Sequence, residues 1–546
     1  MIRMKSVQFT LLIALLMLIS ACAAPATPGD AAESGQTAST ESGEKVLRIA
    51  YGAEIDTLNA LTSQNLTDIE ILMVEGLIMS NDQNTYIPIL AKEIPTLENG
   101  GVVMNDDGSV TMTWNLHEGV KWHDGEEFTS EDVCFTWDFI VSEAGSAVYN
   151  QTEYLNIESC EAPDPYTVVF TWKAPYAPYA SLFDTILPKH VLEGQDVLTY
   201  DAYNRSPLGT GPFKFVEWKT GEYVQVEKNE DYWRGDPYPN IDGIIVQFIP
   251  DPNTRVNALK AGEYDFGQIL PNQVKEVEDL AGYKVELVNT NAWVHFDLNI
   301  ASERGAMLFS DQAVRQALFH AIDREAIARD LMEGTVEVAD TGITPNSPYH
   351  NSDVMKYDFN PEMARQMLEE AGWTDSDGDG ILDKDGESFS FTIINRNSRP
   401  ERVAIAQVIQ ANLKDIGVEV TFENLENASW IEKWLSKDWE AVVSGWIIPA
   451  DPSLTSLYAC DASNNFTGFC SDELDAAMEA SDMVLEFSDR KPLVDEVQAI
   501  LAEEAWSLPL HYLVNPFVLR EDFQNFKGSG TNLGSYWNSY EWDFGQ

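Results

Sequence analysis

Basic side chains are scarce in this chain of 546 residues. Lys and Arg together number 34, against 89 Asp and Glu, and the formal net charge is −55. A chain with this charge repels phosphate backbones and anionic membrane surfaces, so we expect no nucleic-acid partner and no electrostatic binding to a membrane. The acidity either favours cationic ligands or reflects an acid-rich proteome, and the second interpretation is the simpler one.

Motifs of catalysis are also missing. The chain contains no His-Glu-x-x-His zinc helix, no Gly-x-Ser-x-Gly nucleophile turn and no Walker A loop. It has only seven His and five Cys, which leaves few candidates for metal or thiol chemistry. We therefore expect a protein that is not an enzyme and requires no cofactor. An exported hydrolase with a pair of carboxylates is the alternative of a different class.

Aromatic and aliphatic residues are plentiful by contrast. There are 24 Phe, 20 Tyr and 15 Trp, and 44% of the residues are hydrophobic, which is enough for a large packed core. The length predicts two to four domains or one large bilobed unit. No repeat with a period of 20–50 residues is visible, which argues against a solenoid.

A long apolar run occurs only at the N-terminus. Arg3 and Lys5 precede an almost entirely apolar segment, 7–19, which is too short to span a bilayer comfortably. It leads into Ser20-Ala21-Cys22, which resembles the lipobox of bacterial lipoproteins. No other run approaches 18 apolar residues, so we expect no transmembrane helix in the mature protein.

The resemblance to a lipobox predicts how this end of the chain is processed. Residues 1–21 are then a cleaved signal peptide, and Cys22 carries the acyl chains that anchor the protein to a membrane. Residues 22–44 are small and polar and predict a flexible tether. We therefore expect an extracytoplasmic, lipid-anchored protein at the cell surface or in the periplasm.

Export also permits disulfides. Without Cys22, four Cys remain, and four Cys allow three pairings. Proximity in the sequence favours Cys134 with Cys160 and Cys460 with Cys470.

Strands and helices intermingle along the rest of the chain, which predicts a mixed α/β fold that begins near Val46. Apolar patterns predict strands at 46–52, 110–116, 166–172, 223–229, 243–249, 389–394 and 418–425. Helical spacing predicts helices at 311–332, 361–372 and 401–417. The first follows a Ser310/Asp311 cap, and the second lies between Pro361 and Gly372.

Several segments, taken together and in order, resemble one protein family. They are IDTLNAL (55–61) with VEGLIM (74–79) and IPILAKE (87–93), TMTWNLHEGVKWHDGEEFTSEDVCFTWDFI (111–140), LGTGPFKFVEWKTGEYVQVEKNEDYWRGDPYPNID (208–242), FSDQAVRQALFHAIDREAI (309–327) and ASWIEKWLSKDWEAVVSGWIIPADPS (428–453). The set resembles the family 5 extracellular solute-binding proteins of ABC transporters, of the oligopeptide- and dipeptide-binding type. The resemblance covers nearly all of 46–546.

The resemblance implies an α/β fold, a bilobed clamp like the periplasmic binding proteins of type II, with an extra inserted subdomain. Lobe one is discontinuous and comprises 45–86, 197–290 and 512–546. Residues 87–196 form the inserted subdomain, and 291–511 form lobe two. The hinge lies near 293–299 and 510–514. The implied protein is a monomeric receptor that closes on its ligand and delivers it to the permease subunits of an ABC importer.

The resemblance also implies where the ligand binds. In peptide-binding members, the loop after a Gly-Trp pair lies against the ligand, and its main chain pairs with the extended peptide. Here the pair is Gly445-Trp446, followed by Ile447. Three residues after that Trp, where the family has an Asp that holds the α-ammonium, this chain has Pro449. Asp451 either takes over the amine contact or is a turn residue before Pro452.

The departure at Pro449 leaves two ligands open. Peptides are favoured by the resemblance as a whole, and an oligosaccharide is the alternative, because 15 Trp supply stacking platforms. The family further implies contacts from Trp430, from Gln64 and Asn65 beside the cleft, and from Trp293 and Tyr512 at the hinge. Trp293 and Tyr512 can equally be packing residues of the hinge, and a Trp such as Trp430 is more often a core residue than a ligand platform.

An acidic loop after the helix 361–372 has the spacing of a calcium-binding loop. Asp375, Asp377, Asp379 and Asp383, with the main-chain carbonyl of Ile381, follow the pattern Asp-x-Asp-x-Asp-Gly-x-x-Asp. The Glu expected at the twelfth position is replaced by a Gly. The loop therefore predicts either a structural Ca²⁺ site or a plain acidic turn.

Overall fold

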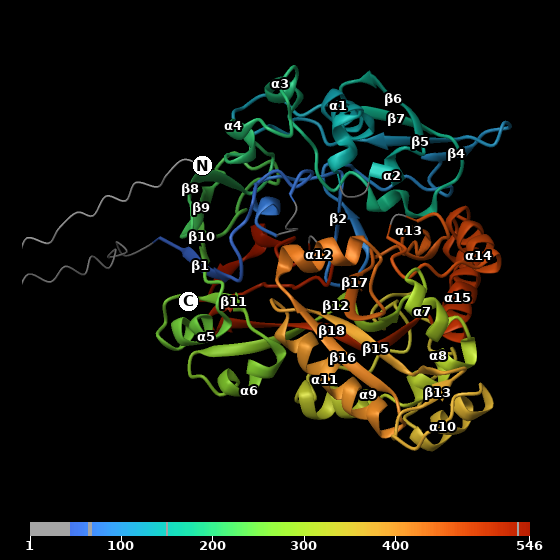
Figure 1. The fold of residues 1–546 in the computed structure, drawn as a ribbon. Helices are drawn as coiled ribbons and strands as arrows, with labels where there is room; N and C mark the ends of the chain where they lie inside the picture. The colour runs from blue at the N-terminus through green and yellow to red at the C-terminus, as the bar shows by residue number, and fades with distance from the viewer. Residues whose placement is uncertain (1–43, 64–67, 149–150, 463, 532–533, 546) are drawn as a thin grey trace, which may run out of the picture. The chain divides into compact units, whose positions relative to one another are not determined.

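Ten strands from distant parts of the chain form one mixed β-sheet, which organises the fold (Figure 1). The computed structural model describes residues 44–63, 68–148, 151–462, 464–531 and 534–545. The predicted signal peptide, Cys22 and nearly all of the predicted tether lie outside the described residues, and so do Gln64 and Asn65. Within the described ranges, no helix is both long enough and apolar enough to cross a membrane.

The strands of this sheet follow the order β16-β15-β17-β12-β18-β11-β1-β10-β9-β8. β1 runs parallel to β10 and β11, and β15 runs parallel to β16 and β17, whereas the other neighbours are antiparallel. The bounds are β1 Val46–Tyr51, β8 Phe213–Lys219, β9 Tyr223–Lys228, β10 Gly243–Phe248, β11 Phe266–Gln268, β12 Tyr283–Leu298, β15 Ser390–Arg396, β16 Glu419–Leu425, β17 Ala441–Ile447 and β18 Ser507–Arg520. All seven strands predicted from the sequence are present, with ends that agree to within two residues.

The long strands β12 and β18 lie side by side at the centre of the sheet. Their register breaks between the pairs Asn289–Val514 and Trp293–Tyr512. β12 is buried at every position from Thr290 to Leu298, as expected for a strand that has neighbours on both edges and is covered on both faces. The two predicted hinge segments are therefore parts of adjacent strands.

A second sheet, in the order β4-β5-β7-β6, is formed within residues 102–172. Its strands are β4 Val102–Met104, β5 Val110–Asn115, β7 Thr167–Trp172 and β6 Ile157–Asp164, and helix α1 (Ser130–Val141) packs against β6 and β7. The disulfide between Cys134 and Cys160 joins α1 to β6. Trp172 of this sheet and Val246 of the large sheet belong to the same buried hydrophobic cluster, so the two sheets share one core.

Helices pack against β15, β16 and β17, which lie between β12 and β18 along the chain. In α11 (Pro400–Asp415) the buried residues Ile405, Ile409 and Leu413 follow a spacing of four and form one apolar stripe. The remaining helices are α2 Gln151–Tyr154, α3 Lys189–Leu192, α4 Asp201–Asn204, α5 Pro252–Lys260, α6 Val274–Val277, α7 Glu303–Phe309, α8 Gln312–His320, α9 Arg324–Ala326, α10 Pro361–Glu370, α12 Asn427–Leu435, α13 Thr455–Tyr458, α14 Asp472–Asp482 and α15 Phe487–Glu504. The short strands are β2 Ile78–Ser80, β3 Tyr86–Pro88, β13 Asp383–Lys384, β14 Glu387–Ser388, β19 Phe523–Gln524 and β20 Asp543–Phe544.

The predicted helix at 311–332 is wrong as a continuous element. The structure divides it into α8, the short α9 and one turn of π-helix, Ile327–Leu331. The Asp323 carboxylate caps α9 by accepting from the Ala326 N–H at 2.8 Å, and Arg324 donates to the Pro509 carbonyl at 3.0 Å. The Asp323 cap starts a new helix at this point, so the segment is not one continuous helix. The helices predicted at 361–372 and 401–417 are present as α10 and α11.

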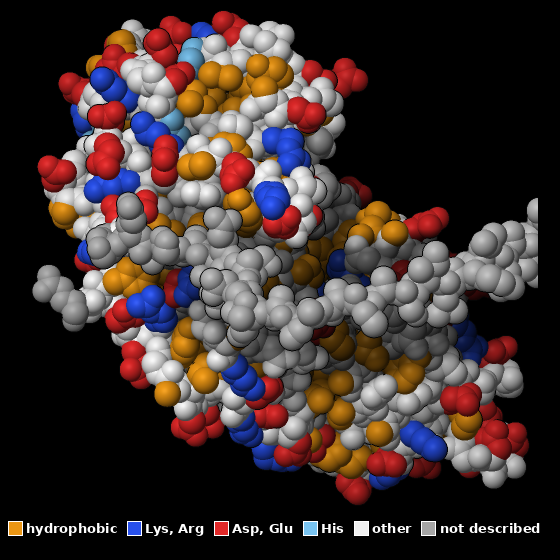
Figure 2. Space-filling view, turned by 90° about the vertical axis from the view of Figure 1, so that its left-hand side faces the viewer, with side chains coloured by type: hydrophobic (Ala, Val, Ile, Leu, Met, Phe, Trp, Pro, Cys, Tyr) orange, Lys and Arg blue, Asp and Glu red, His pale blue; other side chains and the backbone are white. Residues whose placement is uncertain are grey.

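Acidic side chains dominate the surface, as the net charge of −55 requires. Figure 2 shows Asp and Glu spread over the visible face, with Lys and Arg among them. The charge on this face is therefore dispersed, and it marks no single acidic patch there.

Candidate ligand-binding site

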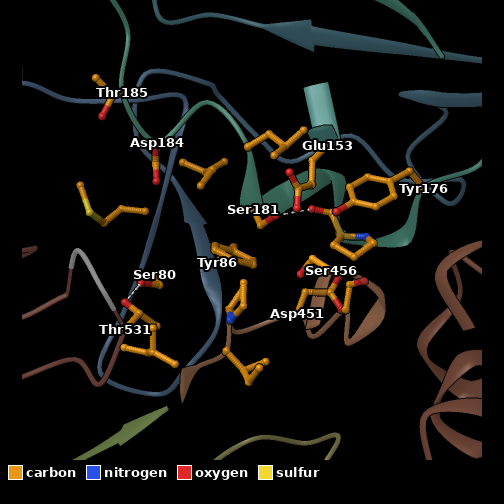
Figure 3. A pocket seen from close by; sticks show the side chains of 18 of the residues that line it. Ser80, Tyr86, Glu153, Tyr176, Ser181, Asp184, Thr185, Asp451, Ser456 and Thr531 are labelled. Carbon is orange, nitrogen blue, oxygen red and sulfur yellow. Dashed lines mark hydrogen bonds between the residues drawn. The ribbon is translucent and has the colours of Figure 1, made fainter. Parts of the chain in front are cut away.

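A cavity of about 200 Å³ lies where four distant segments of the chain meet (Figure 3). It is lined by residues within 60–86, within 148–185 and within 447–457, and by Thr531. The first segment and Thr531 belong to the predicted lobe one, the second to the predicted inserted subdomain, and the third to the predicted lobe two. A ligand in this cavity would therefore contact all three parts.

The loop after β17 forms one wall of the cavity, through residues that include Ile447 and Ile448. The Ile448 N–H donates to the Asn291 carbonyl of β12 at 3.0 Å. Antiparallel pairing alternates, so the main-chain groups of Gly445 and Ile447 point away from β12. On that other side, the described part of β15 pairs with β17 only as far as Val442. Among the described residues, no main-chain partner of Gly445 or Ile447 is found on that side, and the predicted pairing of this segment with an extended peptide stays a prediction.

Asp451 lines the cavity, but its carboxylate already has a cationic partner. Arg490, which is fully buried, forms an ion pair with Asp451 and lies 3.6 Å from the Asp482 carboxylate. Burial raises the pKa of the Asp451 carboxyl, and the Arg490 guanidinium opposes that rise. The contact between Asp451 and a ligand amine stays a prediction, and Arg490 competes with it.

Two further carboxylates, Asp184 and Glu153, line the cavity, and the sequence analysis missed both. Burial raises the pKa of Asp184 to about 6, and burial also raises the pKa of Glu153. Asp184 accepts a hydrogen bond from Thr185, and no cation contributes to the pKa of either carboxyl. Their charge is therefore not compensated by the described residues.

The backbone around Phe183 places Asp184 at the cavity wall. Phe183 has a φ of 61°, which is a strained conformation for a bulky residue. Its N–H donates to the Tyr154 hydroxyl at 2.8 Å, and its carbonyl accepts from the Leu77 N–H at 2.7 Å. A Cβ on Gly76 would lie 2.2 Å from the Asp184 carbonyl carbon, so only glycine permits this approach.

Two tyrosines complete the polar lining. Figure 3 shows Tyr86 in the middle of the site, with Tyr176 beside Glu153 and with Asp451 on another side. Burial is the main cause that raises the pKa of both phenols far above the ordinary value, and nearby carboxylates add to it. Both side chains are therefore neutral at physiological pH and can donate hydrogen bonds.

The predicted aromatic contacts are not in the cavity wall. Trp446 and Trp430 both belong to an aromatic cluster with Trp434 and Phe466, in which Trp446 stacks on Phe466 at 6.2 Å between ring centroids. Trp430 is only 3% exposed. In this structure these rings pack against one another and offer no open platform to a ligand.

The two hinge aromatics are also buried away from the cavity. Trp293 and Tyr512 face each other across β12 and β18 and belong to one hydrophobic cluster. The Tyr512 hydroxyl accepts from the Asp340 N–H at 3.3 Å. Gly445 has a packing role as well, because a Cβ there would lie 2.9 Å from an Arg402 guanidinium nitrogen.

The sequence contained no local signal for the residues that it missed. Glu153, Tyr176 and Asp184 lie in 87–196, a segment that the analysis assigned no ligand contacts, and no motif surrounds them. Tyr86 is an ordinary strand residue of β3. Only the tertiary arrangement brings them to one cavity.

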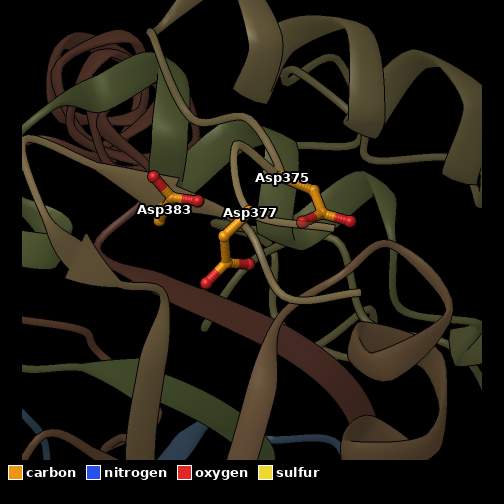
Figure 4. A group of neighbouring side chains, drawn as sticks. All are labelled: Asp375, Asp377 and Asp383. Atoms are coloured by element: carbon orange, nitrogen blue, oxygen red, sulfur yellow. The ribbon is translucent and has the colours of Figure 1, made fainter. Parts of the chain in front are cut away.

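The acidic loop at 375–383 lies outside this cavity. Carboxylate oxygens of Asp375, Asp377 and Asp383 lie within 4.8 Å of one another (Figure 4), whereas the Asp379 carboxylate is not part of the group. Main-chain and hydroxyl donors of the loop already bind these oxygens, for example the Gly378 N–H to Asp375 at 2.7 Å. The structural role of Ca²⁺ in this loop stays a prediction.

The mixed α/β fold with its large central sheet is consistent with a bilobed solute-binding clamp. Residues 85–468 match the model of the bacterial extracellular solute-binding proteins, family 5 Middle, and the chain belongs to this family. The matched region spans more than half of the chain and includes most of the cavity wall.

Similar proteins extend the likeness over almost the whole chain. The sequence is 33% identical over 485 residues to the oligopeptide-binding protein AppA of Bacillus subtilis (strain 168), and the match covers 85% of each chain. The structure of that protein from Bacillus subtilis in complex with a nonapeptide is 29% identical, with a TM-score of 0.78, over 92% of this chain and 100% of the other. The structure of NikZ from Campylobacter jejuni in complex with Ni(L-His) is 26% identical, with a TM-score of 0.80 and the same coverage.

Proposed function

We propose that this chain is the extracytoplasmic receptor of an ABC importer and that its ligands are peptides. The observation that carries the proposal is the 33% identity to an oligopeptide-binding protein over 85% of both chains. The cavity supports it, because the open edge of β17 offers main-chain groups to an extended ligand beside the cavity wall.

Capture of the ligand would work by a shift between open and closed arrangements. A ligand that touches 60–86, 148–185 and 447–457 together stabilises the arrangement in which these segments are close. The register break of β12 and β18 at Asn289 and Trp293 is a natural place for the chain to bend. No residue of the described chain needs to perform chemistry in this cycle.

We further propose the domain boundaries that follow from the family. Lobe one comprises 45–86, 197–290 and 512–546, the inserted subdomain comprises 87–196, and lobe two comprises 291–511. The separate four-stranded sheet supports the insertion, and the separate hydrophobic cluster around Phe296 and Ile393 supports lobe two. A lipid anchor at Cys22, a monomeric state and delivery to permease subunits complete the proposal.

The other ligands have less support. No His or Cys lines the cavity among the described residues, so a bare nickel ion would lack its preferred protein ligands there. An oligosaccharide would lack the Trp platforms expected for it, because Trp430 and Trp446 pack in the aromatic cluster and no Trp lines the cavity among the described residues. A hydrolase would turn its substrate over, which a receptor does not do.

Native mass spectrometry of the purified protein tests the proposal, because buried ligands stay bound during purification. We expect added mass that fragments into amino-acid residues, and saturable calorimetric binding of a peptide pool without cleavage. Binding of an oligosaccharide pool or of Ni(L-His) in place of peptides would contradict it. Cleavage of the peptides would show the hydrolase.

A further inference from the structure

The cavity carries negative charge and no positive charge. Its lining contains three carboxylates, Glu153, Asp184 and Asp451, and no Lys, Arg or His. The internal stretches outside the described ranges, 64–67, 149–150, 463 and 532–533, contain no Lys, Arg or His either. A ligand group that enters the cavity therefore meets a field of one sign.

The three carboxylates differ in their partners. Arg490 forms an ion pair with Asp451, so this carboxylate has a cation of its own. Asp184 and Glu153 have none within ion-pair distance in the described part of the chain, and burial disfavours the charged form of both. An enclosed charge without a partner is costly unless something supplies the opposite charge.

Asp184 is held at the wall by its surroundings. The Phe183 ring stacks on Phe170 at 4.7 Å between centroids and meets Tyr154 edge-on at 5.0 Å. The main chain of Asp184 lies close to Gly76, which fixes the position of the backbone after Phe183. The backbone that carries Asp184 is therefore packed against the core of the inserted segment.

We propose that this cavity is a subsite for a cationic group of the ligand, an ammonium or guanidinium group, with Asp184 and Glu153 as its counter-charges. The inference rests on the proposed function, since it specifies which peptides the proposed receptor prefers. The volume of about 200 Å³ lies below that of sites which enclose whole small molecules, about 300–1,000 Å³, and it suits one side chain or one terminal amine.

The tyrosines fit the same ligand group. Their phenols are neutral, so they add no repulsion and can orient a bound cation by their ring faces or oxygen atoms. Two sources supply the same chemistry, the α-ammonium of the peptide and the side chain of Lys or Arg. The preference of the receptor is then for peptides with a positive charge at the position that reaches the cavity.

Calorimetry with four synthetic nonapeptide pools tests this inference. All pools share the same randomised neutral residues. Each has either one Lys at a randomised position or norleucine in its place, and either a free or an acetylated N-terminus. We expect the wild type to bind the acetylated norleucine pool about 10- to 100-fold more weakly than a pool that retains the required charge. A loss of affinity on acetylation identifies the α-amine as the group in the cavity. A loss of affinity on replacing Lys by norleucine identifies the side chain instead.

Variants connect this preference to the two carboxylates. We expect Asp184→Asn and Glu153→Gln each to reduce the preference, by about tenfold for the stronger contact, and the double variant to abolish it. All variants should bind the acetylated norleucine pool as the wild type does. Asp138→Asn and Glu158→Gln, at exposed positions of the same segment, serve as matched controls and should leave the preference unchanged.

The outcomes separate the inference from the function on which it rests. Equal binding of all four pools by the wild type, or a preference that survives in the double variant, would overturn the subsite and leave the peptide receptor in place. Failure of the wild type to bind any pool would overturn both.

Discussion

Asp184 illustrates how one residue can be costly to the fold and useful to binding. Its carboxyl is enclosed, and burial raises its pKa to about 6, because no cation among the described residues offsets the loss of water. Phe183 before it has a φ of 61°. Strain and uncompensated charge at adjacent residues are common at binding sites, where the ligand supplies what the protein lacks.

We expect Asp184→Asn to stabilise the ligand-free protein in a pH-dependent way. The pKa of Asp184 is about 6 when folded and near 3.8 when unfolded. The folded protein thus binds more protons between these values, and its stability falls as the pH rises through that window. Ionisation of Asp184 lowers the free energy of unfolding by ~3 kcal/mol at pH 7.5 and by ~1 kcal/mol at pH 4.5. An Asn side chain does not ionise and so avoids this loss.

Urea unfolding of both proteins at the two pH values measures the difference. The groups that face Asp184 are Thr185 and the phenols of Tyr86 and Tyr154, none of which titrates in this range. Asp138→Asn should show no such dependence. A variant no more stable than the wild type at pH 7.5 would mean that water or an unseen partner compensates Asp184.

At the scale of elements, two disulfides hold the segments that border the cavity. Cys134–Cys160 ties α1 to β6 in the sheet that carries the 148–185 wall, and Cys460–Cys470 closes the loop between α13 and α14. The structure contains both pairings that proximity in the sequence favoured. Since neither Cys pair lines the cavity, their contribution is to stability.

We expect the loss of either disulfide to lower the melting temperature. The bridges span 26 and 10 residues, so the chain-entropy estimate is about 3–4 kcal/mol for Cys134–Cys160 and about 2–3 kcal/mol for Cys460–Cys470. Both Cys of a pair are changed to Ala together, which leaves no reactive thiol. Differential scanning calorimetry should rank the 134/160 variant as the less stable. The reverse ranking would argue against an entropic origin.

The acidic loop before β13 gives a prediction about calcium. If the carboxylates of Asp375, Asp377 and Asp383 hold Ca²⁺, chelator should lower the melting temperature and added Ca²⁺ should restore it. Asp377→Ala should remove this response. Asp106→Ala, in the acidic turn between β4 and β5, should keep it. A wild-type melting curve that ignores both chelator and Ca²⁺ would identify a plain acidic turn.

At the scale of the whole molecule, β12 and β18 connect the two halves of the large sheet. They join the strands β1, β8, β9, β10 and β11 to the strands β15, β16 and β17 in a single sheet. The cavity lies beside this connection, since Ile448 lines the cavity and its N–H donates to the Asn291 carbonyl of β12.

The anchor gives a prediction for the intact protein in its cell. We expect Cys22→Ala to release the protein from membranes or to block its processing, because acyl chains on Cys22 supply the attachment. Fractionation and intact-mass analysis of the wild type and the variant measure both effects. Membrane retention of a fully cleaved variant would contradict the lipid anchor.

Much of the fold could be predicted from local pattern. The strands were found from apolar runs and the helices α10 and α11 from Pro, Gly and helical spacing. The prediction of one helix at 311–332 failed at Asp323 and Arg324, because Asp323 caps a new helix and Arg324 bonds to the carbonyls of Ala339, Tyr357 and Pro509, which lie outside the predicted helix. Trp430 and Trp446 were proposed for the ligand from their type and place in the family pattern, and only the structure shows that Trp430 packs on Trp434 and Trp446 on Phe466.

The sequence by itself determined the family, the mixed α/β class and the disulfide pairs, since these follow from short-range order and from motifs in series. Only the tertiary structure decided the chemistry of the site. It gave Asp451 a partner, Arg490, and it brought Asp184 and Glu153 to the cavity without one. The physical reason is that the energy of a carboxylate depends on which charges and how much water surround it, and its neighbours here come from distant parts of the chain.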